Sequence, residues 1–127
     1  LNGKYGFIDK NGEFVIESKF DDAWSFSEGL AAVGLNGKWG FIDKNGEFAI
    51  KPKFDDIWDF REGLARVELN GKYGFIDKNG EFAIKPKFDD IWDFREGLAR
   101  VELNGKYGFI DKNGEFVIEP IFDDIYY

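Results

Sequence analysis

The sequence contains no cysteine, no methionine and no histidine. Without cysteine there are no disulfides and no thiol nucleophiles, and without histidine there are no imidazole bases and no His-based triads. Nearly every zinc, haem or iron–sulfur site also needs one of these two residue types. Carboxylates, lysines, hydroxyls and aromatic ring faces remain for chemistry. Because methionine is missing altogether, we expect this stretch to be a processed product or a piece of a longer chain.

Basic residues and long hydrophobic runs are also scarce. There are 17 Lys and Arg against 25 Asp and Glu, which gives a formal net charge of −8. A surface of this sign repels the phosphates of nucleic acids and anionic lipids. The longest apolar run, counting glycine, covers residues 29–35, far below the ~20 residues of a membrane helix. We therefore predict no nucleic-acid partner and no membrane insertion.

Aromatic residues, by contrast, are abundant. The chain has 15 Phe, 5 Tyr and 4 Trp, and 43% of its 127 residues are apolar. This is enough for the core of one domain or of a short repeat array. A chain with so many large rings does not stay solvated, so disorder is excluded as its main state.

The sequence repeats itself with a period of 34 residues. Leu1, Leu35, Leu69 and Leu103 begin successive units, which predicts one array over residues 1–127. The units are residues 1–34, 35–68 and 69–102 and a partial unit, 103–127. The second and third units differ only by Trp39 against Tyr73. Such identity indicates recent duplication or a deliberately idealised sequence, and it argues against four independent small domains.

The turn-forming and strand-breaking residues of one unit are spaced as in β-structure. Asn36-Gly37 suits a two-residue type I′ hairpin turn, and residues 43–46 (Asp-Lys-Asn-Gly) suit a type I turn followed by a glycine bulge. Lys51-Pro52 indicates that a strand breaks or reaches a sheet edge. A fourth extended piece, residues 57–60, ends at a turn over residues 61–63. No ten-residue window keeps a helical period without Gly or Pro, so we predict an all-β fold.

Alternation along these strands predicts which side chains face inward. The inward pairs are Trp39 with Phe41, Phe48 with Ile50, Trp58 with Phe60, and Ala65 with Val67. The core is then expected to contain two columns of rings, one of Tyr5, Trp39, Tyr73 and Tyr107 and one of Phe7, Phe41, Phe75 and Phe109. Gly6, Gly40, Gly74 and Gly108 follow the first column directly, where a missing side chain allows a neighbouring ring or backbone to approach closely.

One unit is too small to offset the conformational entropy lost on ordering 34 residues. Stacking on a neighbour has to supply the rest, so we expect the units to share a continuous core.

The recurring pattern Gly-Lys-Trp/Tyr-Gly-Phe-Ile-Asp-Lys-Asn-Gly-Glu-Phe, followed by Phe-Asp-Asp and Glu-Gly-Leu-Ala, resembles the WG (or KWG) repeat found in bacterial proteins. The residues that carry the resemblance are Tyr5-Gly6, Trp39-Gly40, Tyr73-Gly74 and Tyr107-Gly108, each preceded by lysine. Tyr replaces the name-giving Trp in three of the four units, which keeps the ring and adds a hydroxyl. The resemblance covers the whole chain and implies a β-rich array with no agreed biochemical activity.

Two architectures fit such an array. We favour an open, solenoid-like array of stacked β-hairpins or meanders, with a small β-propeller as the alternative. A closed propeller wants four strands in each blade and a last blade sealed by both chain ends. Here the Gly-Leu-Ala strand occurs only three times, at residues 29–33, 63–67 and 97–101, for four hairpins. The ends of an open array would be unsealed, so we expect one copy to stack head to tail on the next, or flanking repeats to cover them.

The candidate sites have structural explanations that we prefer. Asp55-Asp56 and its copies, the only paired carboxylates, would point to opposite faces of a strand, and we expect them to accept backbone hydrogen bonds at a turn. Residues 9–12 and their copies resemble the start of a calcium loop but lack the further ligands. Trp24, Trp58 and Trp92 could be sugar-stacking platforms, although packing in the core explains them better. Arg66 and Arg100 are read as solvated charge.

The predicted function is a non-catalytic repeat scaffold that binds a protein partner, since nearly identical repeats offer no unique polar cluster for catalysis. No catalytic residue, cofactor or metal is assigned. The alternatives are a filament subunit that assembles head to tail and a glycan-binding surface protein. The sequence fixes no compartment, although an extracellular or cell-envelope location is preferred.

Overall fold

The structure is a computed structural model that describes residues 3–123, apart from the side chain of Phe14. These residues form antiparallel β-strands and no helix. The strands are β1 (Tyr5–Ile8), β2 (Phe14–Phe20), β3 (Asp22–Ala23), β4 (Ala31–Leu35), β5 (Lys38–Ile42), β6 (Phe48–Phe54), β7 (Asp56–Arg61), β8 (Leu64–Leu69), β9 (Lys72–Ile76), β10 (Phe82–Phe88), β11 (Asp90–Ile91), β12 (Ala99–Leu103), β13 (Lys106–Ile110) and β14 (Phe116–Phe122). The all-β prediction is confirmed.

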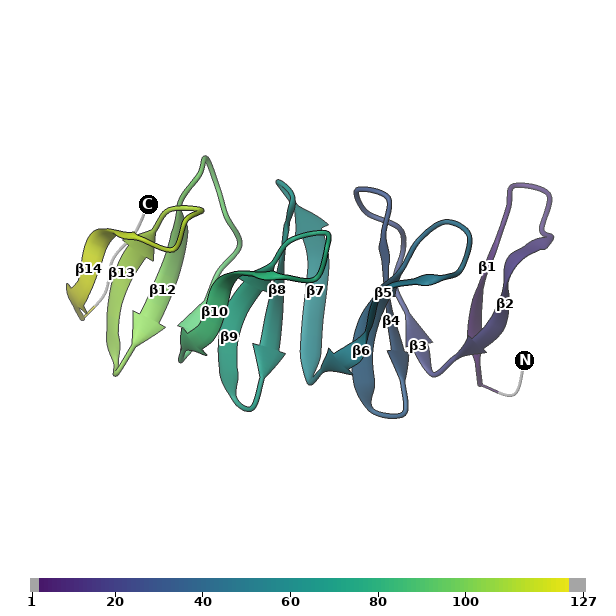
Figure 1. Ribbon diagram of the computed structural model, residues 1–127, viewed down its shortest axis with the longest axis horizontal. Helices are drawn as coiled ribbons and strands as arrows, with labels where there is room; N and C mark the ends of the chain where they lie inside the picture. The colour runs from purple at the N-terminus through teal and green to yellow at the C-terminus, as the bar shows by residue number, and fades with distance from the viewer. Residues whose placement is uncertain (1–2, 124–127) are drawn as a thin grey trace.

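The strands form four small sheets that follow one another along the molecule (Figure 1). The first sheet is β1-β2, and the others are the meanders β3-β4-β5-β6, β7-β8-β9-β10 and β11-β12-β13-β14. Strands β1 and β14 lie at opposite ends of the row, so the array is open and the propeller alternative is wrong. Each meander combines the end of one 34-residue unit with the start of the next.

The turns that the sequence marks are found where they were predicted. Asn36 and Gly37 have φ angles of 56° and 83°, as a type I′ turn requires, and residues 70–71 and 104–105 repeat this geometry. In the second turn, Gly46 N donates to Asp43 O at 3.0 Å, and Asp43 Oδ1 accepts from the backbone N–H groups of Asn45 and Glu47. The hairpin turn therefore accounts for the Asp-Lys-Asn-Gly segment, as predicted.

The three prolines of the chain lie on sheet edges. Pro52 is in β6, Pro86 in β10 and Pro120 in β14, and these are the last strands of their sheets. An edge strand has one side without ladder partners, so a residue that lacks an N–H is tolerated there. The prediction of an edge is correct, and the strand continues through the proline.

Phenylalanine pairs join consecutive sheets. Phe41 of β5 packs on Phe60 of β7 with ring centroids 4.6 Å apart, and Phe75 packs on Phe94 at 4.8 Å. All four side chains are buried. Phe60 belongs to the sheet after that of Phe41, and Phe94 lies between β11 and β12, strands of the sheet after that of Phe75. The core therefore lies between the sheets and is continuous along the array, as the repeat predicts.

The other predicted ring column is not in the core. Trp39, Tyr73 and Tyr107 are half-buried, and Tyr5 is 51% exposed. Phe48, expected to face inward, is 38% exposed. A β-bulge explains the exposure of Phe48: the adjacent residues Phe41 and Ile42 of β5 pair with Ile50 and Phe48 of β6, so Phe48 and Ile50 no longer share a face.

A bulge in β7 has the same effect on the fourth strand. The register shifts between Ile57 and Phe60, and these two side chains are buried while Trp58 between them is half-buried. Strict alternation would have buried Trp58 together with Phe60. Ala65 and Val67, in a regular strand, are buried as predicted.

The glycine after each signature ring is covered by backbone. A Cβ added to Gly6 would lie 2.6 Å from the carbonyl oxygen of Ile16, and Gly40, Gly74 and Gly108 meet the bulged strand in the same way. The close approach predicted at these positions is therefore made by the neighbouring strand.

An aspartate links each sheet to the next. Asp55, between β6 and β7, accepts a hydrogen bond from Lys38 Nζ in its own sheet and from the backbone N–H of Asn70, in a turn of the following sheet, at 2.8 Å. These two hydrogen bonds, that to Lys38 first, hold the pKa of the Asp55 carboxyl below its usual value. Asp21 and Asp89 are bonded in the same way. The first aspartate of each of these three Asp-Asp pairs is thus a turn-capping residue, as predicted.

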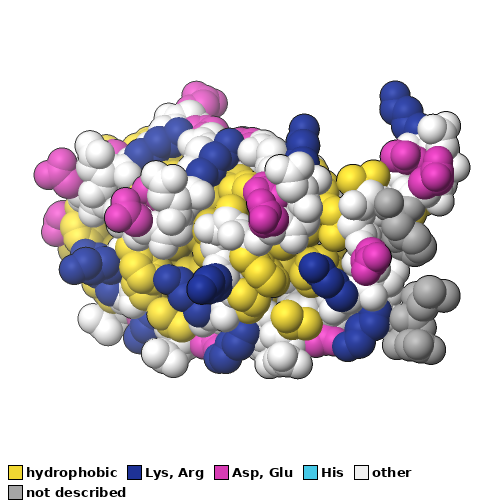
Figure 2. Space-filling model, turned by 45° about the vertical axis from the view of Figure 1, so that its right-hand side comes forward, with side chains coloured by type: hydrophobic (Ala, Val, Ile, Leu, Met, Phe, Trp, Pro, Cys, Tyr) yellow, Lys and Arg dark blue, Asp and Glu magenta, His cyan; other side chains and the backbone are white. Residues whose placement is uncertain are grey.

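Large apolar side chains are exposed mainly toward the two ends of the array. The most exposed are Tyr5, Ile8 and Val15 in the first sheet, and Val117, Ile121 and Phe122 in β14. Hydrophobic side chains also surface between the charged groups on the face that Figure 2 shows. Within residues 3–123, no helix is long and apolar enough to cross a membrane.

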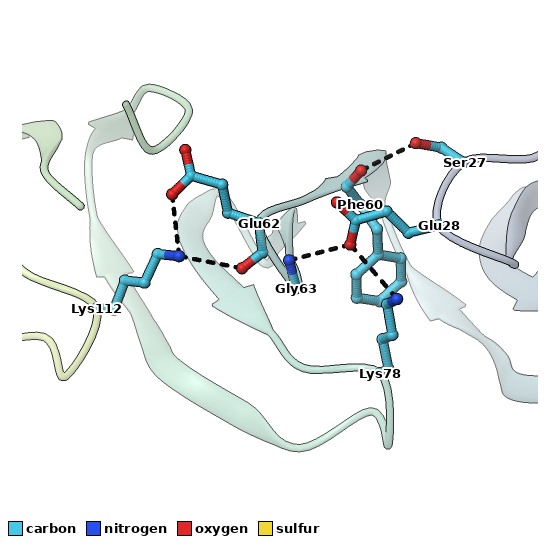
Figure 3. A network of polar contacts seen from close by, with 7 residues as sticks. All are labelled: Ser27, Glu28, Phe60, Glu62, Gly63, Lys78 and Lys112. Carbon is cyan, nitrogen blue, oxygen red and sulfur yellow. Dashed lines mark hydrogen bonds and ion pairs between the residues drawn. The ribbon is translucent and has the colours of Figure 1, made fainter. Parts of the chain in front are cut away.

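A line of polar contacts runs between the turns of successive sheets (Figure 3). Glu28 Oε1 accepts from Gly63 N at 3.0 Å and lies 3.4 Å from Lys78 Nζ, while Glu62 lies 3.0 Å from Lys112 Nζ. Both glutamates have a φ of 52°, a region that favours Asn or Gly. A shorter side chain would suit the turn better, but glutamate has the length to reach the next sheet.

Replacing Gly74 by alanine should destabilise the array. The new Cβ would collide with the backbone of Ile84, which cannot move without disturbing the bulge, and we expect a loss of about 1–3 kcal/mol in the free energy of unfolding. Gly34→Ala is the matched control, because its Cβ would meet its nearest atoms at an ordinary 3.5 Å. Urea unfolding followed by circular dichroism measures both. Equal stability of the two variants would contradict the packing described.

The Asp55 junction makes stability depend on pH in the acid range. Because the folded pKa is lowered, the junction stabilises the protein fully above the unfolded pKa of about 3.9, and this stabilisation is lost as the pH falls through the folded pKa. Asp55→Asn should lower the melting temperature at neutral pH and flatten its acid dependence, and Lys38→Met should reproduce part of the loss. Thermal melts between pH 7 and pH 2 test this. Superimposable profiles for the Asn variant and the parent chain would refute it.

Candidate interaction face

Three strands of each full meander bring two rings and one variable residue side by side. In the third sheet these are Trp58 of β7, Arg66 of β8 and Tyr73 of β9, all half-buried. The same positions hold Trp24, Ala32 and Trp39 in the second sheet and Trp92, Arg100 and Tyr107 in the fourth. We call this set of nine residues the aromatic ladder.

The arginines of the aromatic ladder lie over its rings. The guanidinium carbon of Arg66 is 4.1 Å from the ring centroid of Trp58, and that of Arg100 is 4.4 Å from Trp92 and 4.7 Å from Tyr107. A cation over a ring face is attracted to the negative charge of the π-system. The planar, weakly hydrated guanidinium tolerates this partial burial better than an ammonium group would.

The rings themselves are in contact within each sheet. The centroids are 6.0 Å apart for Trp58 and Tyr73 and 6.1 Å for Trp92 and Tyr107. In the second sheet, where alanine replaces arginine, Trp24 and Trp39 meet edge to face at 5.6 Å. The first full meander therefore presents two tryptophans and no cation, and the next two each present a guanidinium.

Arg66 also connects its sheet to the following one. One terminal nitrogen donates to the backbone carbonyl of Ile91, in β11, at 2.5 Å. The Nε atom of Arg66 is buried and has no acceptor among the described residues. The prediction that Arg66 and Arg100 are solvated charges is therefore wrong, because both are half-buried and stacked on aromatic rings.

Carboxylates surround the phenol of the middle rung. Burial, followed by the negative charges of Glu68, Asp90 and Asp56, raises the pKa of Tyr73, and Arg66 opposes this shift. Tyr73 consequently keeps its hydroxyl proton at neutral pH and can act as a hydrogen-bond donor. The rung of Trp58, Arg66 and Tyr73 thus offers a ring edge, a hydroxyl donor and a guanidinium next to acidic groups.

The structure brings together two sets of residues that the sequence kept apart. The signature rings Tyr73 and Tyr107 were assigned to a buried column, and Trp58 and Trp92 to the core without a partner ring. In the structure they form contacting, half-buried pairs. The arginine between them carries the missed signal. It stands at an alternate position of a strand otherwise rich in Ala, Val and Leu, on the face opposite Ala65 and Val67.

The calcium alternative has no support in this geometry. The first aspartate of each Asp-Lys-Asn-Gly turn accepts hydrogen bonds from the turn backbone at residues 11 and 13, 45 and 47, 79 and 81, and 113 and 115. Over residues 3–123, no group of three or more acidic side chains lies close enough to hold a metal ion.

Comparison with known families agrees with the repeat seen in the sheets. The WG containing repeat family matches four consecutive segments, residues 5–39, 39–73, 73–107 and 107–127. No curated protein and no solved structure matches the chain. Each matched segment begins at a signature ring, and the matches run without a gap from residue 5 to the end of the sequence. The chain therefore belongs to the family of WG containing repeat proteins.

Proposed function

We propose that this chain is a non-catalytic scaffold whose aromatic ladder binds a protein partner. The observation that carries the proposal is the recurrence of one half-exposed arrangement, Trp-Arg-Tyr, on consecutive sheets. Tryptophan, tyrosine and arginine are the residue types that contribute most binding energy at protein interfaces. A regular row of such groups suits an extended segment that contacts several sheets at once, as repeat proteins bind along their length.

The preformed geometry favours binding over catalysis. The rings are held by one another and by the guanidinium, so little side-chain entropy is lost when a partner covers them. The groups nearest to them are carboxylates, a phenol and guanidinium groups, repeated from sheet to sheet, which provides no single site where an acid, a base and a nucleophile converge.

A glycan would have less access to these rings. Sugar stacking needs an open aromatic face, and Arg66 and Arg100 already cover one face of Trp58 and Trp92. Only the Trp24 rung, with Ala32, lacks this cover. A protein partner can contact the guanidinium groups as part of the binding surface, whereas a stacked sugar would have to displace them.

Selection from a displayed peptide library tests the scaffold proposal. Peptides selected on the chain should bind Trp58→Phe/Trp92→Phe at least about tenfold more weakly, because phenylalanine keeps a packing ring but loses indole area and the indole N–H. Phe82→Leu is the control, since Phe82 is exposed but outside the aromatic ladder. Circular dichroism melts verify that each variant is folded. Selection of no binders, or of binders that ignore the tryptophan pair but lose affinity for Phe82→Leu, would overturn the proposal.

A second candidate function is assembly of copies into filaments, and the exposed apolar side chains at the two ends favour it. Ile8 and Val15 are exposed in the first sheet, and Ile121 and Phe122 in the last strand. Contact between these different surfaces is heterologous and can propagate.

Sedimentation velocity tests the assembly candidate. The weight-average mass should rise with protein concentration, and Ile121→Lys should shift this rise to at least about tenfold higher concentration, because the contact would have to bury a charge. Lys44→Glu, a change on an exposed turn, serves as the control. A single monomer mass at every concentration would eliminate the candidate.

A further inference from the structure

Lysine side chains are concentrated on the last strands of the second and third sheets. Strand β6 carries Lys51 and Lys53, β10 carries Lys85 and Lys87, and all four side chains are exposed. None of the four makes an ion pair with any residue between 3 and 123. A chain with a net charge of −8 thus carries a local concentration of positive charge on these two strands.

The carboxylates next to these lysines in the sequence have other partners. Neither strand contains an acidic residue, and each is followed directly by an aspartate. Asp55, after β6, accepts hydrogen bonds from Lys38 and from the backbone of Asn70, and Asp89, after β10, is bonded in the same way. These aspartates are therefore not available to neutralise Lys53 and Lys87.

The fold does not require lysine at these positions. The strands β2 and β14 have the same place in their units as β6 and β10, yet the position of Lys51 is occupied by Glu17 in β2 and by Glu119 in β14. In β14 the position of Lys53 is occupied by Ile121. A charge on an edge strand discourages the addition of a further strand, and a glutamate can do this as well as a lysine. Edge protection therefore does not explain the lysine pairs.

An exposed phenylalanine accompanies each lysine pair. Phe48 in β6 is 38% exposed, and Phe82 in β10 is 37% exposed. The bulge in β6 places Phe48 on the side opposite to Ile50, and Lys51 also points away from Ile50 because successive side chains of a strand alternate. Phe48 and Lys51 therefore share one side of β6, and β10 repeats this register.

A buried ring connects the groups of the two strands. The ammonium nitrogen of Lys53 lies 5.4 Å from the ring centroid of Phe54, and Phe82 meets the same ring edge to face at 6.1 Å. The space-filling view shows a face on which basic and hydrophobic side chains lie next to one another along the molecule (Figure 2). We use the term lysine–phenylalanine face for the set Phe48, Lys51, Lys53, Phe82, Lys85 and Lys87.

We propose that the lysine–phenylalanine face is a docking surface for an acidic segment of a partner protein, one that carries an apolar side chain between its carboxylates. The carboxylates would meet the lysines, and the apolar side chain would cover Phe48 or Phe82. Opposite charges select the partner and speed its association, and burial of the exposed ring area adds affinity. This surface is separate from the aromatic ladder, so the proposal does not depend on the ladder binding a partner.

An acidic peptide fits this face better than a nucleic acid does. The affinity of a nucleic acid comes largely from phosphates, and four lysines on a chain of net charge −8 offer few contacts for a polymer of such high charge density. A base also needs an open aromatic face on which to stack. Phe48 and Phe82 are each engaged by a neighbouring ring and are little more than one-third exposed, which is enough for contact with an aliphatic or ring side chain.

Fluorescence anisotropy with the labelled peptide Asp-Glu-Phe-Asp-Glu-Leu-Asp-Glu tests the proposal on the full chain. We expect saturable binding that weakens as salt is added, and at least about tenfold weaker binding to Lys51→Glu/Lys85→Glu, which places like charges opposite the peptide. This variant should fold, because glutamate already occupies the equivalent positions in β2 and β14. Phe48→Gln/Phe82→Gln should also bind more weakly, and circular dichroism melts verify that each variant is folded.

Lys10→Glu/Lys44→Glu is the matched control. It has the same net charge as Lys51→Glu/Lys85→Glu, and both lysines are exposed on turns outside the lysine–phenylalanine face, so its affinity should stay within about twofold of that of the parent chain. Absence of saturable binding, or an equal loss in the two charge variants, would overturn the proposal. Tighter binding of a single-stranded oligonucleotide than of the peptide would overturn it too, as would loss of peptide binding in Trp58→Phe/Trp92→Phe, which would assign the peptide to the aromatic ladder.

Discussion

The array depends on the apolar surface that each small sheet can bury only against the next one. A four-stranded meander of about 33 residues has too little interior of its own to offset the entropy of folding. The Phe41–Phe60 and Phe75–Phe94 contacts place the core between sheets. The contacts between neighbouring sheets therefore supply the stability of the array. A feature that fixes the shape of a sheet, such as the backbone contact at Gly40, stabilises the whole array through these contacts.

Polar groups set the spacing of these junctions because ring packing alone is tolerant of sliding. Asp55 is bonded both to a lysine of its own sheet and to a turn of the next, so a shifted sheet would leave a carboxylate without its donors. Glu62 also links two sheets, at the turn between β7 and β8. Its φ is unfavourable for glutamate, and the contact of its side chain with Lys112 offsets this cost. Exposed ion pairs contribute little energy individually. Their value here lies in selecting one arrangement from several that bury similar area.

Sequence reasoning predicted the turns and the open array, because their signals are local or periodic. Asn36-Gly37 requires positive φ at two successive residues, and few other turns satisfy that. It failed where β-bulges interrupt alternation: Trp58 and Phe48 were assigned to the core, and the bulges turned them toward solvent. Nothing in a single sequence marks a bulge when no glycine stands in the bulged strand. Arg66 was misjudged for a related reason, since its burial depends on rings from two other strands.

The variable residue of each rung changes what the array presents without changing the strands that carry it. With arginine at this position, the signature ring is flanked by an indole and covered by a guanidinium, as at Tyr107. With alanine, as in the second sheet, Trp24 and Trp39 meet edge to face at 5.6 Å and no arginine stands between them. In a nearly perfect repeat, a single substitution on one face is therefore enough to make one rung chemically different from its neighbours.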